Sequence, residues 1–400
     1  MPEADRTIII GAGVAGLTAG IALRQVGIEA TIFEASSAVR EIGAGLGIQY
    51  AAMKALRTIG LEDAVCELGE PLTAMVWTTW DGKPLVTIPH VPLQEKLGAQ
   101  THNVHRGEFL NLLVREFGLD RIEVGAKFQG FEEDTSGVTV HFEGGRTERG
   151  AVLVGADGSR SRVRSHSLGD GDPRRTNIVV WRSMPGFEHP LLPVGVLRQA
   201  YGPGKMFSMI PGTQQRVFFF AVGLVSEFGE EPGTGPKQEL MDGFGAWAEP
   251  VVELLRATPE TEITRTRIFD RPPAGHWGTT RATLAGDAAH PMIPTLGQGA
   301  STGIEDGVVL ANYLSQAGSL ADGEAVQRAL RAYEADRIAR TTPLVKNAHR
   351  FAPIALASNP VSTRLRDLFL RSSTDASWQR RLLSQHSYEL PSVARAERVQ

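Results

Sequence analysis

The sequence predicts an α/β fold in which a discontinuous domain with a parallel sheet is interrupted by a second, mainly antiparallel β-sheet domain and is followed by a helical C-terminus. Three observations lead to this prediction. A glycine-rich turn directly follows the first apolar strand, two further glycine–aspartate motifs lie near residues 155 and 286, and a strand-rich block separates these two motifs. Because motifs of one kind flank the block, we expect the chain to leave the first sheet and later return to it.

The first part of the chain fits a βαβ unit of the Rossmann type. The apolar run Thr7–Ile10 has the character of a buried strand, and Gly-Ala-Gly-Val-Ala-Gly follows at once. In such a turn Gly11 permits the tight bend, Gly13 allows the backbone to approach a pyrophosphate, and Gly16 lets the helix pack closely on the strand. A second strand ends at Glu34, about 20 residues further on, where a carboxylate accepts hydrogen bonds from a ribose. The alternative is a glycine-rich turn in some other βαβ unit.

The next elements return the chain to the first sheet. The pattern predicts, in order, a helix over 51–59, a hairpin over 73–90 with an Asp-Gly turn, a helix opened by Arg106, short strands at 122–124, 127–132 and 138–142, and a buried strand at 152–154. This last strand ends at Asp157, in the second motif Gly-Ala-Asp-Gly.

The strand-rich block lies at 178–224. Its strands are expected at 178–184, 194–201, 206–210 and 217–222, with a helix over 238–255 after them, a strand at 283–285, a helix over 300–314 and a mainly helical chain from 333 onward. We therefore assign 1–72, 100–177 and 275–345 to the first domain, 73–99 and 178–274 to the inserted domain, and 346–400 to a C-terminal helical segment.

The third motif places a carboxylate at the edge of the sheet. The strand at 283–285 ends at Asp287, on the side of a parallel sheet where ligands usually bind. Gly297-Gln298-Gly299 then starts the long helix, whose free N–H groups and dipole favour a negative charge. The alternative for Asp287 is a helix cap or a turn aspartate.

The composition of the whole chain gives no sign of several classes of partner. A net charge of −4 does not suggest nucleic acid or an anionic membrane as a partner, and no run approaches the length of a membrane span. The single cysteine, Cys66, cannot form an internal disulfide and fits a reducing compartment, so a cytoplasmic location is expected. We expect no metal site.

Together the three motifs resemble those of the single-component FAD-dependent aromatic hydroxylases with the para-hydroxybenzoate hydroxylase fold, in the salicylate-hydroxylase-like branch. The resemblance covers about the first 350 residues. It implies FAD as cofactor, NADH or NADPH as reductant, and O2-dependent hydroxylation of a small phenolic or polycyclic aromatic molecule through a flavin C4a-hydroperoxide. The cofactor-binding residues that it implies are Gly11, Gly13, Ala15, Gly16, Glu34, Ala35, Arg40, Arg106, Asp157, Gly158, Asp287, Gly297, Gly299 and Ala300. The motifs also include Arg164, behind Asp157.

The substrate is less clearly marked. Candidates to line its pocket are Trp181, Arg182, Gln199, Tyr201, Met209, Phe218, Phe220, His290, Pro291 and Pro294, and Arg182, His290 and Pro291 are the catalytic candidates. Arg182 could bind an acidic substrate or form an internal ion pair. His290 could face the flavin, accept a phenol proton or be a packed core histidine. Urate hydroxylases have an arginine and a tyrosine where this chain has Met206 and Phe218, which favours a more apolar ring than a purine.

Two other functions stay open at this point. One is a tailoring flavin monooxygenase or epoxidase that acts on a polyketide or another natural product, and the other is a non-catalytic flavin-binding protein. Near the C-terminus, apolar residues alternate with arginines over 361–371, as in a membrane-surface helix or in a helix that packs on the body or on a second subunit of a homodimer.

Overall fold

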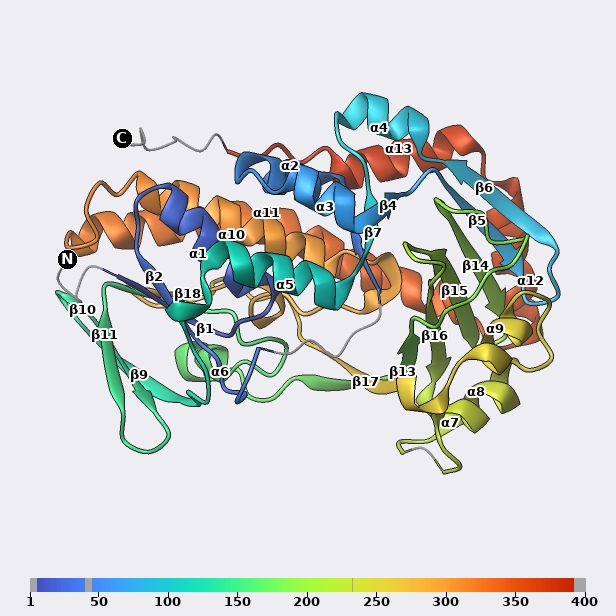
Figure 1. Ribbon diagram of the computed structural model, residues 1–400, viewed down its shortest axis with the longest axis horizontal. Helices are drawn as coiled ribbons and strands as arrows, with labels where there is room; N and C mark the ends of the chain where they lie inside the picture. The colour runs from blue at the N-terminus through green and yellow to red at the C-terminus, as the bar shows by residue number, and fades with distance from the viewer. Residues whose placement is uncertain (1–5, 40–44, 232, 392–400) are drawn as a thin grey trace.

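The computed structural model describes residues 6–39, 45–231 and 233–391. Figure 1 shows a parallel sheet near the N-terminal end of the long axis and a larger sheet at the other end. The parallel sheet has the order β18-β12-β1-β2-β8, and every neighbouring pair in it is parallel. Its strands are β1 (Thr7–Ile10), β2 (Ala30–Phe33), β8 (Ile122–Glu123), β12 (Val152–Gly155) and β18 (Ala282–Leu284). The predicted α/β class is confirmed.

Two helices from distant parts of the chain pack together against this sheet. Helix α1 (Val14–Gln25) follows the glycine turn, and α10 (Gly299–Ser315) follows the third motif. A Cβ on Gly307 would lie 2.5 Å from the backbone nitrogen of Ala19, so the two helices approach as closely as a glycine allows. The surrounding elements are α5 (Arg106–Phe117), α6 (Arg162–Leu168), and the antiparallel strands β9 (Phe128–Asp134), β10 (Gly137–Phe142) and β11 (Thr147–Gly150).

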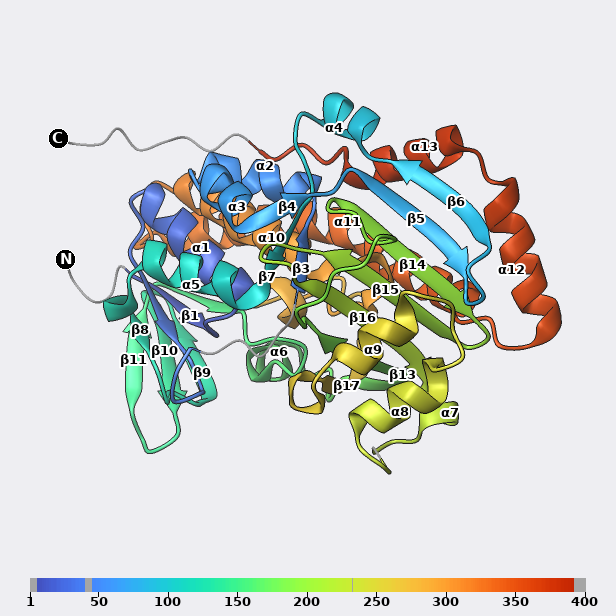
Figure 2. The ribbon, with the colours of Figure 1, turned by 45° about the vertical axis from the view of Figure 1, so that its right-hand side comes forward.

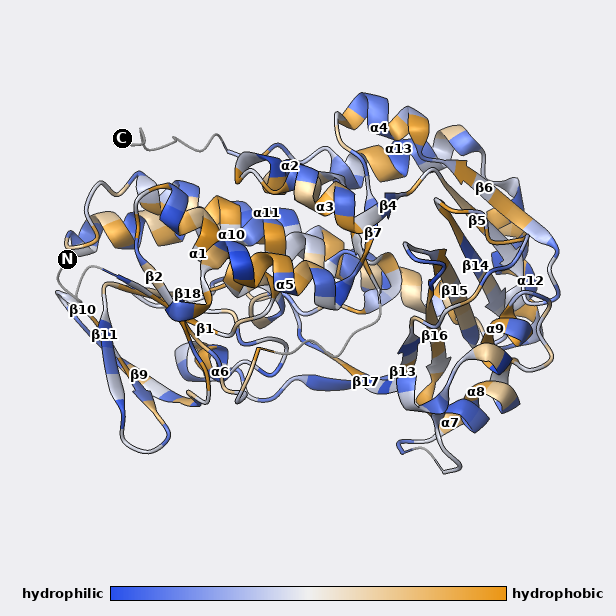
Figure 3. Ribbon diagram, in the orientation of Figure 1, coloured by the Kyte–Doolittle hydropathy of each residue, from blue (hydrophilic) through white to orange (hydrophobic). Residues whose placement is uncertain are grey.

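The second large sheet has the order β17-β13-β16-β15-β14-β5-β6, and all neighbours are antiparallel except β14 and β5. It joins the early hairpin to the strand-rich block. Its strands are β5 (Ala74–Thr79), β6 (Pro84–Pro89), β13 (Arg174–Ser183), β14 (Val196–Gly202), β15 (Lys205–Pro211), β16 (Val217–Leu224) and β17 (Thr264–Asp270). In Figure 3 hydrophobic residues run along much of β6 and β16, in agreement with cores on both faces of this sheet.

Helices cover one face of this sheet. They are α7 (Val225–Phe228), α8 (Pro236–Phe244) and α9 (Val251–Ala257). The prediction of one helix over 238–255 was wrong, because the chain turns between Gly245 and Pro250. Gly245 ends α8, and Pro250 precedes the first residue of α9 and has no N–H to continue a helix.

The C-terminal helices are α11 (Gly323–Ala355), α12 (Pro360–Ser372) and α13 (Asp375–His386). Of these three helices, α12 and α13 lie beside the β5–β6 hairpin (Figure 2), and α11 packs on α10. A small sheet of β3 (Gly45–Ile48), β7 (His102–His105) and β4 (Gly69–Pro71) lies between the two large sheets (Figure 2). Helix α2 (Tyr50–Thr58) packs on α10 and on α3 (Glu62–Leu68), and α4 (Val91–Leu97) contacts α13. Among the described residues no helix is long and apolar enough to cross a membrane.

The contact between α1 and α10 provides a test of the packing. Replacing Gly307 with alanine puts a methyl group against the backbone of Ala19, so we expect the free energy of unfolding of the apoprotein to fall by about 1–3 kcal/mol. Thermal unfolding measures this as a lower Tm. The control is Gly275→Ala, where an added Cβ meets no atom within 4 Å. Equal Tm values for both variants would contradict the close approach of the helices.

Candidate active site

A cavity of about 1060 Å³ connects the cofactor motifs to the seven-stranded sheet. Many residues predicted to bind the cofactor line it, although they come from distant parts of the chain. They are Gly11, Gly13, Ala15, Glu34, Ala35, Arg106, Asp157, Gly158, Asp287, Gly297, Gly299 and Ala300. Gly16 does not line the cavity, and Arg40 lies outside the described residues.

The glycine turn has no room for a side chain at Gly11 and Gly16 and is open to the cavity at Gly13. Gly11 has φ +107°, and a Cβ there would lie 2.4 Å from the carbonyl oxygen of Ala156, so the turn requires glycine. A Cβ on Gly16 would lie 2.1 Å from the carbonyl oxygen of Gly11, which explains its place beneath the turn. Around Gly13 no atom lies within 4 Å of an added Cβ, so this backbone is open to a ligand. The turn therefore fits a pyrophosphate.

The carboxylate of Glu34, which follows β2, is hydrogen-bonded to the glycine turn. It accepts hydrogen bonds from the backbone N–H groups of Ala12 (3.0 Å) and Ser36 (2.8 Å). The side chain is thus held at the edge of the cavity, at the end of β2. That position fits a ribose hydroxyl next to the glycine turn.

The second motif does more than border the cavity. Asp157 accepts hydrogen bonds from the N–H groups of Arg162 (2.7 Å) and Val163 (3.2 Å), so it caps α6, and burial raises the pKa of its carboxyl group. Arg164 is fully buried and donates to the carbonyl oxygens of Ala288 (3.1 Å) and Ala289 (2.7 Å). Arg164 therefore ties the second motif to the third.

Asp287 projects into the cavity from the turn that follows β18. Its side chain is exposed to the cavity although protein surrounds it, and this burial raises the pKa of its carboxyl group, against the opposing effect of His290 and Arg106. One carboxylate oxygen lies 3.6 Å from where a Cβ on Gly299 would be, so Asp287 sits beside the first residue of α10. This corner combines an acceptor with the free N–H groups of a helix start.

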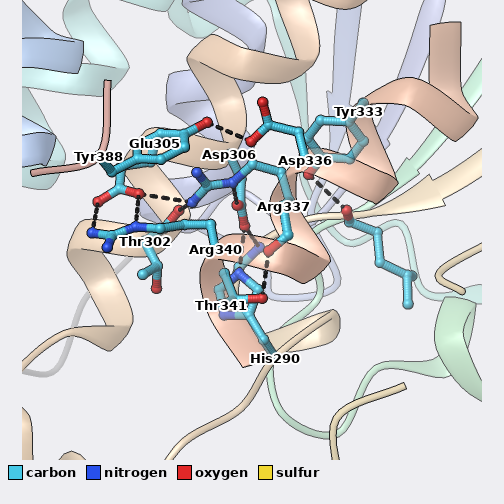
Figure 4. A network of polar contacts seen from close by, with 12 residues as sticks. His290, Thr302, Glu305, Asp306, Tyr333, Asp336, Arg337, Arg340, Thr341 and Tyr388 are labelled. Carbon is cyan, nitrogen blue, oxygen red and sulfur yellow. Dashed lines mark hydrogen bonds and ion pairs between the residues drawn. The ribbon is translucent and has the colours of Figure 1, made fainter. Parts of the chain in front are cut away.

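A buried ionic network lies directly behind this corner (Figure 4). Asp306 on α10 accepts hydrogen bonds from the N–H of Gly286 (2.7 Å) and from Arg337 Nε (2.7 Å), and it pairs with His290 Nε2 (2.6 Å). Arg337 also reaches Glu305 at 2.9 Å. Burial raises the pKa of Asp306, but the charges of His290 and Arg337 outweigh this effect and hold the pKa at about 2. The carboxylate therefore stays ionised and fixes the turn that carries Asp287.

The network changes the interpretation of two catalytic candidates. His290 is 3% exposed, pairs with Asp306 and does not line the cavity, and neither does Pro291. Of the alternatives for His290, a place facing the reaction site is therefore not supported, and a packed, hydrogen-bonded histidine fits the structure, because its ring pairs with Asp306 on α10. Arg182, the third candidate, does line the cavity, and its guanidinium donates to the hydroxyl of Thr266 at 3.2 Å.

The seven-stranded sheet presents alternate side chains to the cavity. On β16, Phe218 and Phe220 line it and Phe219 faces the opposite core, as the period of two requires. The same rule removes Trp181 and Met209 from the predicted pocket, since both belong to the core under α8. Tyr201 is also absent from the lining, because it is buried near Trp77 and Arg366. Of the remaining candidates, Arg182, Gln199 and Pro294 line the cavity.

The far end of the cavity was not predicted. Its wall comes from the hairpin, α11 and α13, and includes Trp77, Ile88, Phe351, Ile354, Trp378 and Leu382. Polar residues lie nearby. The hydroxyl of Tyr50 is 2.6 Å from Nδ1 of His90, and burial lowers the pKa of His90 to about 4 and that of His386 to about 3. The residues of this wall belong to no short motif. The aromatic residues Trp77 on the hairpin and Trp378 on α13 are the sequence signal that could have indicated it.

Comparisons with known proteins find similar proteins over most of the length of the chain. The model of the family described as FAD binding domain matches residues 5–348. The chain is 34% identical over 368 residues to aurachin C monooxygenase/isomerase of Stigmatella aurantiaca, covering 91% of this chain and 93% of that protein. It is 32% identical over 348 residues to an FAD-dependent urate hydroxylase of Klebsiella pneumoniae subsp. pneumoniae, covering 86% and 89%. It also matches the crystal structure of Klebsiella pneumoniae HpxO complexed with FAD and uric acid with a TM-score of 0.87, at 28% identity and with coverage of 96% and 97%.

The network behind Asp287 predicts a pH-dependent loss of stability. Asp306→Asn leaves His290 and Arg337 without their shared carboxylate, so we expect the free energy of unfolding at pH 7 to fall by about 3–5 kcal/mol. In the folded protein the pKa of Asp306 is lowered from its ordinary value of 3.8 to about 2. Its contribution is therefore present above about pH 4 and is lost as the pH falls toward 2.

Urea unfolding of the parent and the variant between pH 7 and pH 2 measures this contribution. The difference in the free energy of unfolding between the two proteins should be constant near neutrality and should shrink only below pH 4. Glu324→Gln, at a carboxylate that is exposed on α11, serves as the control and should change little. A difference in the free energy of unfolding that does not depend on pH would show that the Asp306 carboxylate is not the stabilising group.

Proposed function

Because the chain belongs to the FAD binding domain family, we propose that it hydroxylates a small, largely apolar aromatic molecule held at the sheet end of the cavity. The resemblance inferred from the three motifs is confirmed, and the protein is an FAD-dependent monooxygenase with NADH or NADPH as reductant. FAD, when bound, supplies the electron transfer and the oxygen activation.

The observation that carries the proposal is the continuity of one cavity. Its motif end fits FAD: an open backbone at Gly13, a carboxylate at Glu34, and a carboxylate beside a helix start at Asp287. Its other end is a pocket in the sheet. Ligand sites commonly lie between domains, and their walls are mainly apolar with a few polar groups. A cofactor at one end and an organic substrate at the other would share this space.

The protein residues have distinct roles in the proposed reaction. Gly11, Gly13 and Gly16 shape the pyrophosphate site, and Asp287 accepts a hydrogen bond from a cofactor hydroxyl. The N–H groups at the start of α10 would favour negative charge on a cofactor bound there.

The substrate end favours an apolar ring. Leu197, Met206, Ile210, Phe218 and Phe220 line it. The polar side chains beside them are Arg182, Gln199 and Ser208. The guanidinium of Arg182 donates to Thr266, and the hydroxyl of Ser208 donates to the amide oxygen of Gln199 at 2.9 Å. A purine with many polar atoms would leave several of them unpaired against Met206 and Phe218. This contrast supports an aromatic substrate less polar than urate.

A second candidate is the tailoring of a natural product by oxygenation or epoxidation. It is supported by the far end of the cavity, where Trp77, Phe351 and Trp378 continue the apolar wall beyond Phe218 and Phe220. The relative from Stigmatella aurantiaca is named as a monooxygenase/isomerase, which is compatible with such chemistry.

A panel of phenols, hydroxybenzoates and polycyclic aromatics tests the proposal. We expect at least one apolar member to stimulate NADH or NADPH oxidation and to gain one oxygen atom, as measured by product mass. Urate should be a poor substrate. An epoxide of a polycyclic ring with no hydroxylated product would favour the second candidate. Stimulated oxidation without any coupled product across the panel would contradict hydroxylation of these rings.

The proposed role of Asp287 can be measured without turnover. Asp287→Ala removes a hydrogen-bond acceptor at the cofactor end, so we expect FAD binding to the apoprotein to weaken by about 1–3 kcal/mol. Titration of the apoprotein with FAD, followed by flavin fluorescence, gives the Kd. Asp172→Ala removes an exposed carboxylate that does not line the cavity and should leave the Kd unchanged. If Asp287→Ala binds FAD as tightly as the parent, the third motif does not hold the cofactor.

A further inference from the structure

Helix α12 packs against the protein with a charged inner face. Arg366, 3% exposed, donates to the carbonyl oxygens of Gly202 (2.9 Å) and Ala355 (3.3 Å), and its guanidinium lies 5.4 Å from the centre of the Tyr201 ring. Leu370 is the other buried side chain of the helix. A surface helix usually buries its apolar side and exposes its charges. In α12 an arginine occupies the centre of the buried side.

The opposite side of α12 carries the large apolar residues. Val361, Leu365, Leu368 and Phe369 are 69%, 61%, 63% and 41% exposed, and their spacing of four, three and one residues places them on one side of the helix. These four residues are the outer face of α12. Single exposed apolar residues are ordinary, but four at helical spacing opposite a buried arginine indicate a surface that is covered in use.

The charged residues beside this outer face are mostly basic. Arg364 and Arg371 are exposed on the same helix, and Arg381 is exposed on α13. The acid within α12, Asp367, is bonded to Arg366, and Asp375 lies at the start of α13. An apolar stripe bordered by arginines is the pattern of a helix that lies in a membrane interface.

The outer face continues to the wall of the cavity. The guanidinium of Arg381 lies 5.5 Å from the centre of the Phe369 ring and 5.2 Å from that of Trp378. Both Arg381 and Trp378 line the cavity, and so does Ile354, which is 42% exposed. A surface that covers α12 would therefore lie next to the far end of the cavity.

We propose that the outer face of α12 docks on an anionic lipid surface. The apolar side chains would enter the interface between headgroups and acyl chains, and Arg364 and Arg371 would contact the lipid phosphates. The arginines that border the outer face complement the negative charge of the lipid phosphates, which favours a lipid surface over a second copy of the chain. The proposal does not depend on the identity of the substrate.

Co-sedimentation of the FAD-loaded protein with vesicles is the test. We expect binding to vesicles of phosphatidylglycerol and phosphatidylcholine at low salt, and at least tenfold weaker binding to phosphatidylcholine alone. The double variant Leu365→Glu, Leu368→Glu should lose at least tenfold in binding, while its FAD content and its Tm stay at the parent's values. Arg364→Gln, Arg371→Gln should bind more weakly and show less dependence on salt.

The matched control is Leu119→Glu, since Leu119 is 66% exposed and lies outside α12. It should bind vesicles like the parent. Equal binding to neutral vesicles, or equal losses in the control and the double variant, would overturn the proposal. So would the absence of vesicle binding together with a dimer in light scattering that Leu365→Glu, Leu368→Glu dissociates, which would assign the outer face to a second copy of the chain.

Discussion

A buried charge that must remain paired organises the cofactor end of this protein. Asp306 is inaccessible to solvent, and an isolated carboxylate in such a place would be very unfavourable. It is stabilised by Arg337, by His290 and by the backbone N–H of Gly286. Because these partners come from α11 and from the turn after β18, the same interactions that satisfy the charge fix the position of Asp287 relative to the start of α10.

The rest of the site follows from this fixed edge. Arg164 holds the carbonyl oxygens of Ala288 and Ala289 and so connects β12 and α6 to the same turn. The glycine turn precedes α1, and its position relative to the turn that carries Asp287 is fixed by the close packing of α1 on α10, where Gly307 contacts the backbone of Ala19. Three motifs that are far apart in the sequence thus border one cavity, and the seven-stranded sheet supplies the other wall through the alternate side chains of its strands.

Local patterns predicted much of this arrangement. The apolar strands, the glycine turn and the strand-rich block indicated the α/β class and most of the elements, because each depends on residues close together in the sequence. The single helix over 238–255 was wrong because Gly245 and Pro250 interrupt it. His290 follows Asp287 so closely that a place in the cavity was a natural expectation, and only the three-dimensional position of Asp306 turns its ring away.

The far wall of the cavity shows the limit of such patterns. Phe351 on α11 and Trp378 on α13 lie more than 270 residues along the chain from Trp77, which they face. An amphipathic helix does not indicate which part of the molecule it will cover. The inverted packing of α12 likewise depends on carbonyl oxygens of Gly202 and Ala355 that accept from Arg366, contacts that no sequence period marks.

The central claim is that one FAD is held by all three motifs in a cavity that also accepts the substrate. A crystal structure of the FAD-loaded protein tests it most directly. The account predicts contacts to FAD from the glycine turn at 11–16, from Glu34 and from the segment 287–300, with the Asp306–Arg337 pair intact. An FAD that leaves Asp287 and the start of α10 without contact, or that fills the space between Met206, Phe218 and Phe220, would contradict it.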